Sequence, residues 1–183
     1  MLRNLLLALF VAVTCALAVP GAHAGDDAEP VVLTVTGNVE KPNRGPLDPF
    51  DDVVFAHLEV KFDKGFTFTL SDLKALPQRT VKVRYAEWPR EVEASGPAIS
   101  DVLKAASAEG KKILVQAIDG YAPEFTGEDI ARDKMILALT ADGKALGFGG
   151  RGPLWLLGPV DSFAGQDGEG GFAFAVVHID VKK

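Results

Sequence analysis

Short apolar runs that end at turn-forming residues recur along this chain, and they constrain its fold more than any other feature. Several runs alternate apolar and polar residues at the two-residue period of a strand; residues 66–70, for example, alternate rings with threonines. Strands are therefore expected over residues 31–36, 66–70, 80–87, 92–97, 113–118, 134–140, 145–148, 153–157 and 172–181. The last of these is apolar on both faces, which predicts a central position in a sheet.

A few segments have the features of short helices instead. Ser71 is expected to cap a helix over residues 72–76, and residues 98–109 carry an apolar stripe at helical spacing. Thr126 is expected to cap a single helical turn, whereas residues 53–61 fit either a strand or a helix. Many strands and a few short helices in mixed order, with no internal repeat, predict one α+β domain with a β-rich, mixed or barrel-like sheet.

The first 24 residues have the pattern of an export signal. A short basic start precedes an apolar run over residues 5–19, which is too short for a comfortable membrane span. Small residues at Ala22 and Ala24 predict cleavage after Ala24, and an uncleaved anchor fits this pattern less well. Removing 24 of the 183 residues leaves a mature chain of 159: a flexible acidic tail over 25–30 and a domain over 31–183.

Charge and cysteine content exclude several classes of function. After cleavage 18 basic residues face 25 acidic ones, so the net charge of −7 argues against nucleic acid as a partner. The only cysteine, Cys15, lies in the leader, so the mature chain has no disulfide and no thiolate ligand. His57 and His178 have no neighbouring histidine at metal-binding spacing, so we interpret both as surface or half-buried structural residues.

Residues 113–129 contain the first candidate binding feature. An apolar run of strand length breaks at Asp119-Gly120, and Tyr121 and Phe125 follow the break. A strand that ends in a turn with a carboxylate and flat rings is a plausible wall for a small planar ligand. The competing interpretation, which the residues alone favour, is that Tyr121 and Phe125 close the end of the core.

Two further loops, which begin at Glu87 and at Arg151, also combine aromatic and charged residues near a strand end. The chain therefore has three such loops. A heteroaromatic ligand can stack on an indole or phenol ring, while a carboxylate accepts paired hydrogen bonds from its amidine edge and a guanidinium holds its oxygens. Trp155 lies among leucines, which favours a core position for it. The candidate ligand-binding residues are Glu87, Trp88, Arg90, Asp119, Tyr121, Arg151 and Trp155.

Enzyme motifs are absent from the sequence. It has no Gly-x-Ser-x-Gly, no recognisable Ser/His/Asp spacing and no phosphate-binding glycine loop. The glycines of residues 147–152 lack the strand-then-helix context of a dinucleotide site. No catalytic residue and no metal ligand is therefore assigned.

A series of motifs in order along the chain resembles the sulfite-oxidase-type molybdopterin-binding domain, in its small, exported, single-domain branch. The resemblance covers residues 31–181, and it implies an α+β, β-rich fold with a pterin cleft. The motifs are Phe-Thr-Leu-Ser-Asp-Leu from Phe68, Gly-Pro-Ala-Ile-Ser-Asp-Val-Leu from Gly96, Ala-Ile-Asp-Gly-Tyr from Ala117, Asp-Gly-Lys from Asp142 and Gly-Pro-Leu-Trp-Leu-Leu-Gly-Pro-Val-Asp from Gly152.

The departure from this family lies at Trp88. In the molybdenum enzymes of the family a Glu-Cys pair follows the corresponding strand, and its thiolate ligates the metal; here Glu87 is followed by Trp88. The resemblance implies a pterin pocket without the metal, with Glu87, Trp88 and Arg90 on its former metal side and Asp119, Tyr121, Arg151 and Trp155 along the rest.

Some cysteine-free relatives bind free pterins and relay that signal to a membrane-bound cyclic-di-GMP enzyme, and this chain is similar to them. The sequence therefore predicts a non-catalytic periplasmic pterin-binding protein with a membrane-bound signalling partner. The alternative is a molybdopterin-dependent oxidoreductase, or one subunit of it, that carries the molybdenum cofactor through a non-thiolate ligand.

Overall fold

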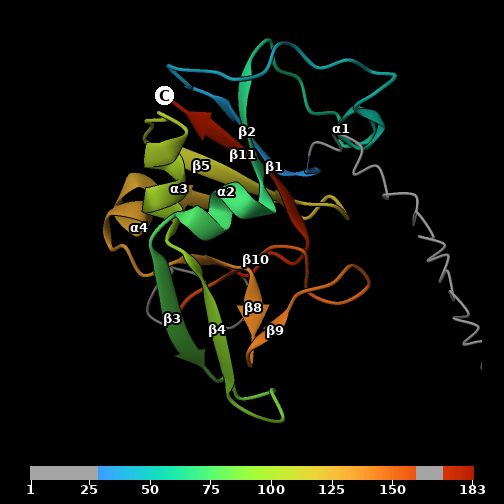
Figure 1. Ribbon diagram of the computed structural model, residues 1–183. Helices are drawn as coiled ribbons and strands as arrows, with labels where there is room; N and C mark the ends of the chain where they lie inside the picture. Colours follow the sequence, from blue (N-terminus) through green and yellow to red (C-terminus); the bar gives the residue numbers. More distant parts are fainter. Residues whose placement is uncertain (1–28, 160–170) are drawn as a thin grey trace, which may run out of the picture.

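The computed structural model describes residues 29–159 and 171–183, which form a sheet-rich α+β fold (Figure 1). Within these residues there are three sheets and four short helices. The predicted leader, residues 25–28 of the predicted tail and residues 160–170 lie outside the described residues. The predicted fold class is confirmed.

The C-terminal strand is central to the largest sheet. In the order β2-β1-β11-β5-β6, β11 (Val176–Lys182) pairs in parallel with β1 (Val31–Gly37) and antiparallel with β5 (Lys112–Ala117). The edges are β2 (Gly65–Thr69) and β6 (Glu124–Thr126). The predicted central position is confirmed, although the strand begins four residues later than expected.

A four-stranded sheet forms the lower half of the molecule in Figure 1, in the order β3-β4-β8-β9. The long hairpin of β3 (Gln78–Val83) and β4 (Val92–Pro97) is followed by the short one of β8 (Thr140–Ala141) and β9 (Lys144–Ala145). The predicted turn at Asp142-Gly143 joins the second pair, with Asp142 and Gly143 both at positive φ, as a tight hairpin requires.

The third sheet is the pair β7 (Ile136–Ala138) and β10 (Trp155–Leu157). Residues 134–140 do not form one strand as predicted, because the chain leaves this sheet at Leu139 and joins the four-stranded sheet at Thr140. The Leu139 N–H donates to the carbonyl of Ser95 in β4 at 2.8 Å, which fixes the crossing. Two sheets thus share one segment of chain.

The helices are short and lie outside the sheets. Residues 53–61, for which the sequence fitted either a strand or a helix, contain a helix. Two of the other helices are capped by a threonine hydroxyl. Thr126 caps the last helix as predicted, whereas the predicted cap Ser71 is wrong: Thr69 caps that helix and forms a capping box with Asp72. The four are α1 (Val53–His57), α2 (Leu70–Ala75), α3 (Ile99–Ala105) and α4 (Gly127–Ala131).

The strand predicted over residues 80–87 ends earlier, at Val83. The chain turns at Ala86 and Glu87, where the Trp88 N–H donates to the Tyr85 carbonyl at 3.0 Å. A continuous strand would have placed Tyr85 and Trp88 on opposite faces. The turn instead directs both rings into the core, where they are 4% and 7% exposed.

Candidate functional site

An aromatic cluster fills the space where the β3–β4 connection, β10 and the segment before β11 meet. Trp88 lies 5.6 Å from Trp155 and 5.4 Å from Tyr85, measured between ring centroids. Phe172 packs edge-on against Tyr85 at 4.9 Å, and Phe174 lies 5.7 Å from Trp155. Trp155 is completely buried, so its predicted core position is confirmed.

Arg151 covers the outer side of this cluster. The carbon at the centre of its guanidinium lies 4.6 Å from the Trp155 ring centroid, 5.2 Å from that of Trp88 and 5.3 Å from that of Phe174. These distances are within the range of cation–π attraction. Within the part of the chain that the structure describes, no carboxylate forms an ion pair with Arg151. The rings therefore position the guanidinium, and its positive charge can interact with a ligand.

Arg151 borders a hollow of about 540 Å³, which we call the ring hollow. Two exposed rings, Phe148 and Phe174, line it with Arg151 and the predicted site residue Asp119. Its remaining lining is Ile118, Gly149, Gly150, Gly152 and Ala175. The volume is within the range of small-molecule sites. The ring hollow thus presents a carboxylate, a guanidinium and two flat apolar rings.

Long-range backbone hydrogen bonds bring the segments of the ring hollow together. The Ile118 N–H donates to the Ala175 carbonyl at 3.0 Å, and the Ala175 N–H donates to the Arg151 carbonyl at 3.1 Å. These bonds join the end of β5, the start of β11 and the loop before β10. The site therefore depends on the pairing of strands that are far apart in the sequence.

On the other side of the 147–152 loop lies a smaller hollow of about 290 Å³, which we call the cationic hollow. It is lined by Arg90, Lys144, Arg151 and Trp155, together with small and apolar residues. Arg90 pairs with Asp142 at 2.5 Å. A bond from the Glu93 backbone N–H and a second from Arg90 hold the pKa of Asp142 below its usual value, so this carboxylate stays ionised at neutral pH.

Five of the seven predicted site residues lie at the two hollows, and two stay apart. Arg90, Asp119, Arg151 and Trp155 line them, and Trp88 packs against Arg151 and Trp155. Glu87 is exposed in the β3–β4 turn, and Tyr121, which is 43% exposed, lines neither hollow. Tyr121 supports the site indirectly, because its backbone N–H donates to Asp119 Oδ1 at 3.0 Å and so orients that carboxylate. Partial burial raises the pKa of its phenol.

Sequence reasoning missed Phe148, Phe174 and Lys144. The sequence predicts Phe148 in a returning strand, but that strand, β9, ends at Ala145. It predicts Phe174 in the final strand, which begins only at Val176. The signal that could have found the two phenylalanines is the glycine content of residues 147–152 and 165–171, which disfavours regular strands.

The donor atoms around Trp88 do not suit molybdenum. Rings and a guanidinium surround Trp88, and none of these groups is a soft ligand. Among the described residues, no group of three or more His, Cys, Asp or Glu side chains is placed to hold a metal ion. The residues of the ring hollow do suit a pterin, which offers an amidine edge, a carbonyl and a flat face.

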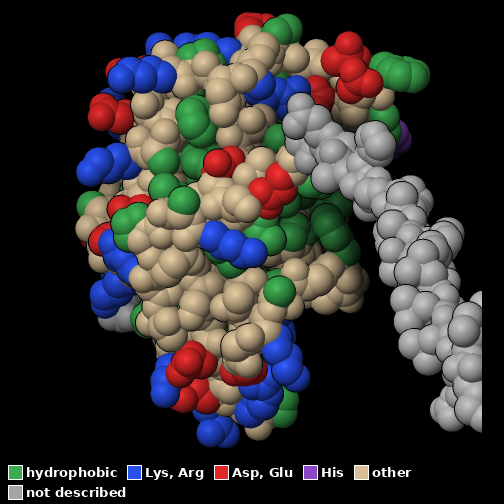
Figure 2. Space-filling model, viewed as in Figure 1, with side chains coloured by type: hydrophobic (Ala, Val, Ile, Leu, Met, Phe, Trp, Pro, Cys, Tyr) green, Lys and Arg blue, Asp and Glu red, His purple; other side chains and the backbone are tan. Residues whose placement is uncertain are grey.

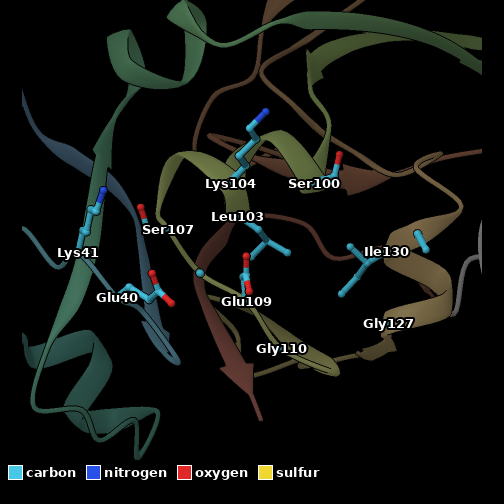
Figure 3. Close-up of a pocket in the computed structure, with 12 residues that line it drawn as sticks. Glu40, Lys41, Ser100, Leu103, Lys104, Ser107, Glu109, Gly110, Gly127 and Ile130 are labelled. Carbon is cyan, nitrogen blue, oxygen red and sulfur yellow. The ribbon is translucent and has the colours of Figure 1, made fainter.

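A further hollow, of about 470 Å³, lies beside α3 and α4 (Figure 3). Leu103 and Ile130 extend toward each other across it, while Lys104 extends away. In Figure 1, α3 and α4 lie on the opposite side of the molecule from α1 and the β9–β10 connection. None of the predicted site residues lines this hollow. Separately, no helix of the described residues is long and apolar enough to cross a membrane.

Comparisons with known proteins support the fold. No protein-family model matches the chain, and no curated protein sequence matches it either. Among solved structures, the chain is similar to the sulfane dehydrogenase SoxCD from Paracoccus pantotrophus, with a TM-score of 0.57 and 21% sequence identity. The match covers 82% of this chain and 37% of that chain. This likeness is one of fold, and the α+β, β-rich fold of the sulfite-oxidase type that the sequence predicted is confirmed.

Proposed function

We propose that the protein binds a free pterin in the ring hollow, catalyses no reaction of its own, and relays pterin occupancy from the periplasm to a membrane-bound cyclic-di-GMP enzyme. One observation carries the ligand part of this proposal. Asp119 and Arg151, chosen from separate loops of the sequence, line the same hollow beside the exposed rings of Phe148 and Phe174.

Each group in the ring hollow has a partner on a pterin. The Asp119 carboxylate accepts hydrogen bonds from the amidine edge, and the Arg151 guanidinium donates to the ring carbonyl. Phe148 and Phe174 offer faces for stacking, each worth about 1–3 kcal/mol by analogy with nucleobases. Trp88, the better stacking candidate in the sequence, holds Arg151 in this arrangement instead, together with the buried Trp155.

Asp119→Asn tests the ligand site. The amide oxygen can still accept the Tyr121 N–H, so the turn is retained, but the charged acceptor is lost. We expect the affinity for a pterin, measured by isothermal titration, to fall about tenfold. Glu87→Gln removes an exposed carboxylate that lines neither hollow and should leave affinity unchanged. Equal affinity in Asp119→Asn and the parent protein would show that the ring edge does not lie at Asp119.

The relay part of the proposal is supported by an exposed apolar surface beside the ring hollow. Another hollow, of about 380 Å³, which we call the apolar hollow, is bordered by the exposed side chains of Val31, Val54, Ile118 and Phe148. Ile118 and Phe148 line the ring hollow as well. Figure 2 shows hydrophobic side chains below α1, on this side of the molecule. A partner seated here would contact residues that also contact the ligand.

Site-specific cross-linking tests the relay. Val54 borders the apolar hollow without lining the ring hollow, so a photoreactive residue there should cross-link to a membrane protein in the native host. The same residue at Lys82, exposed on β3, is the control and should give no such product. Added pterin should change the yield at position 54. Equal cross-linking from both positions would contradict a specific partner surface.

The alternative function is an oxidoreductase that uses the molybdenum cofactor, and the similar solved structure is a dehydrogenase. The pterin part of that cofactor would contact Asp119 and Arg151 in the same way. Metal analysis of protein exported by its native host separates the two functions: stoichiometric molybdenum would favour the oxidoreductase, and bound pterin without molybdenum would favour the sensor.

A further inference from the structure

The cationic hollow adjoins the ring hollow, and its charge is strongly one-sided. Arg90, Lys144 and Arg151 line it, and among the described residues no carboxylate does. Asp142 pairs with Arg90 and also interacts electrostatically with Lys144. One carboxylate thus offsets part of the charge of three lining cations, which leaves a net positive charge in a small hollow.

The hydrogen-bonding groups of this region are donors. Trp155 lines the cationic hollow, and its indole N–H is buried without an acceptor, as is that of Trp88. Buried donors of this kind are rare in folded proteins. Together with two guanidinium groups and an ammonium group they make a region in which the lining side chains offer donors. An anion supplies acceptors and opposite charge together.

The two hollows meet at Gly150 and Arg151, which line both. Among the described residues, a Cβ atom at Gly150 would have one neighbour within 4 Å, the Gly147 carbonyl oxygen at 3.5 Å. The surface over Gly150 is therefore open. A ligand whose ring lies in one hollow can extend a substituent past Gly150 into the other, with Arg151 in reach of both parts.

We infer that the ligand of this site is a pterin with an acidic substituent, a phosphate ester or a carboxylate, and that Arg90, Lys144 and Arg151 bind that substituent in the cationic hollow. This inference rests on the proposed pterin site and adds the class of ligand to it. Arg151 lies where the two hollows meet, and its guanidinium has donors for both the ring carbonyl and the acidic group.

Isothermal titration with three probes tests the inference: 6-hydroxymethylpterin, its phosphate monoester and pterin-6-carboxylate. We expect the parent protein to bind one or both acidic probes at least about tenfold more tightly than the alcohol. This preference should shrink as salt is raised from about 0.01 M to 0.15 M, because the hollow is open to solvent. The two acidic probes distinguish phosphate from carboxylate.

The Lys144→Gln variant tests whether Lys144 binds the acidic substituent. Lys144 lines the cationic hollow only, so the variant should lose most of the preference for the acidic probe and keep its affinity for the alcohol. Lys82→Gln, an exposed lysine on β3 that lines neither hollow, should keep both affinities. Retained affinity for the alcohol also shows that the Lys144 variant is folded.

Gly150→Leu tests the junction between the hollows. The backbone there has no positive φ and the space is open, so the variant should fold and bind the alcohol while binding the acidic probe less tightly. Equal affinity of the parent protein for all three probes would overturn the inference and leave pterin binding intact. Failure of all three probes to bind would overturn the proposed function itself.

Discussion

His178 is the residue whose protonation has the largest expected effect on this protein. It lies in central strand β11, only 2% exposed, and is thus more deeply buried than the sequence predicted. Its Nε2 contacts the Thr36 hydroxyl at 2.7 Å and its Nδ1 contacts Gln116 Oε1 at 3.2 Å. Burial lowers its pKa from 6.5 to about 4, while Asp180 opposes and Lys182 adds to this shift.

Stability should therefore fall on acidification. Above pH 6.5 His178 is neutral in both the folded and unfolded chain; between pH 6.5 and about 4 the unfolded chain takes up the proton first, which favours unfolding. The free energy of unfolding should fall by on the order of 3 kcal/mol across that window. Urea denaturation of the parent protein and His178→Gln at several pH values measures this.

The variant should remove that part of the pH dependence, since glutamine does not titrate. His57→Gln is the matched control, because His57 is exposed on α1 and its replacement should leave the free energy of unfolding unchanged. If the free energy of unfolding depended on pH in the same way in the parent protein and in His178→Gln, the assignment of this pH dependence to His178 would be wrong.

At the scale of elements, two short helices depend on the same local device. The hydroxyls of Thr69 and Thr126 each accept a bond from the backbone N–H three residues on, at 3.1 Å and 3.3 Å, and the aspartate carboxylate there accepts a bond from the threonine N–H. Helices this short gain little from their internal hydrogen bonds. Their ends are therefore an important part of their stability.

Thr69→Ala should accordingly lower the free energy of unfolding by about 1 kcal/mol, because the hydroxyl acceptor of α2 is lost. Ser71→Ala, at the cap position that the sequence suggested, should change it by less than about 0.5 kcal/mol. Chemical denaturation of both variants under identical conditions gives the comparison. The reverse order of effects would mean that Ser71 is the cap.

At the scale of the whole molecule, Gly96 marks a close approach of two sheets. A Cβ atom at this position of β4 would lie 2.0 Å from the Leu137 carbonyl oxygen and 2.7 Å from the Ala138 Cα, both in β7. Neither is the movable end of a side chain. The sequence identified Gly96-Pro97 as the end of a strand, but the glycine is required because backbone meets backbone there.

Gly96→Ala should therefore destabilise the protein by about 1–3 kcal/mol or more, because the sheets must separate to admit the methyl group. Gly45→Ala is the control: no atom of the described part of the chain lies within 4 Å of its added Cβ, so the change should stay within about 0.5 kcal/mol. Thermal unfolding of both variants measures the difference. A Gly96→Ala protein as stable as the parent would show that the contact between β4 and β7 can adjust.

The sequence by itself determined the local structure: the α+β class, the hairpin turn at Asp142-Gly143, the cap at Thr126 and the central final strand. Each depends on hydrogen bonds or steric preferences within a few residues, or on the apolar pattern of a single strand. Asp119 and Arg151 were also selected from the sequence, because a charge beside an aromatic residue at a strand end is visible locally.

Only the tertiary structure decided which residues share a hollow. The turn at Ala86 and Glu87 directs Trp88 inward and leaves Glu87 in solvent, and Phe148, Phe174 and Lys144 come to the site from segments expected to be strands or a hairpin. The physical reason is that β11 pairs between β1 and β5, which joins Ile118 to Ala175 and Ala175 to Arg151. Such long-range pairing leaves no local signature in the sequence.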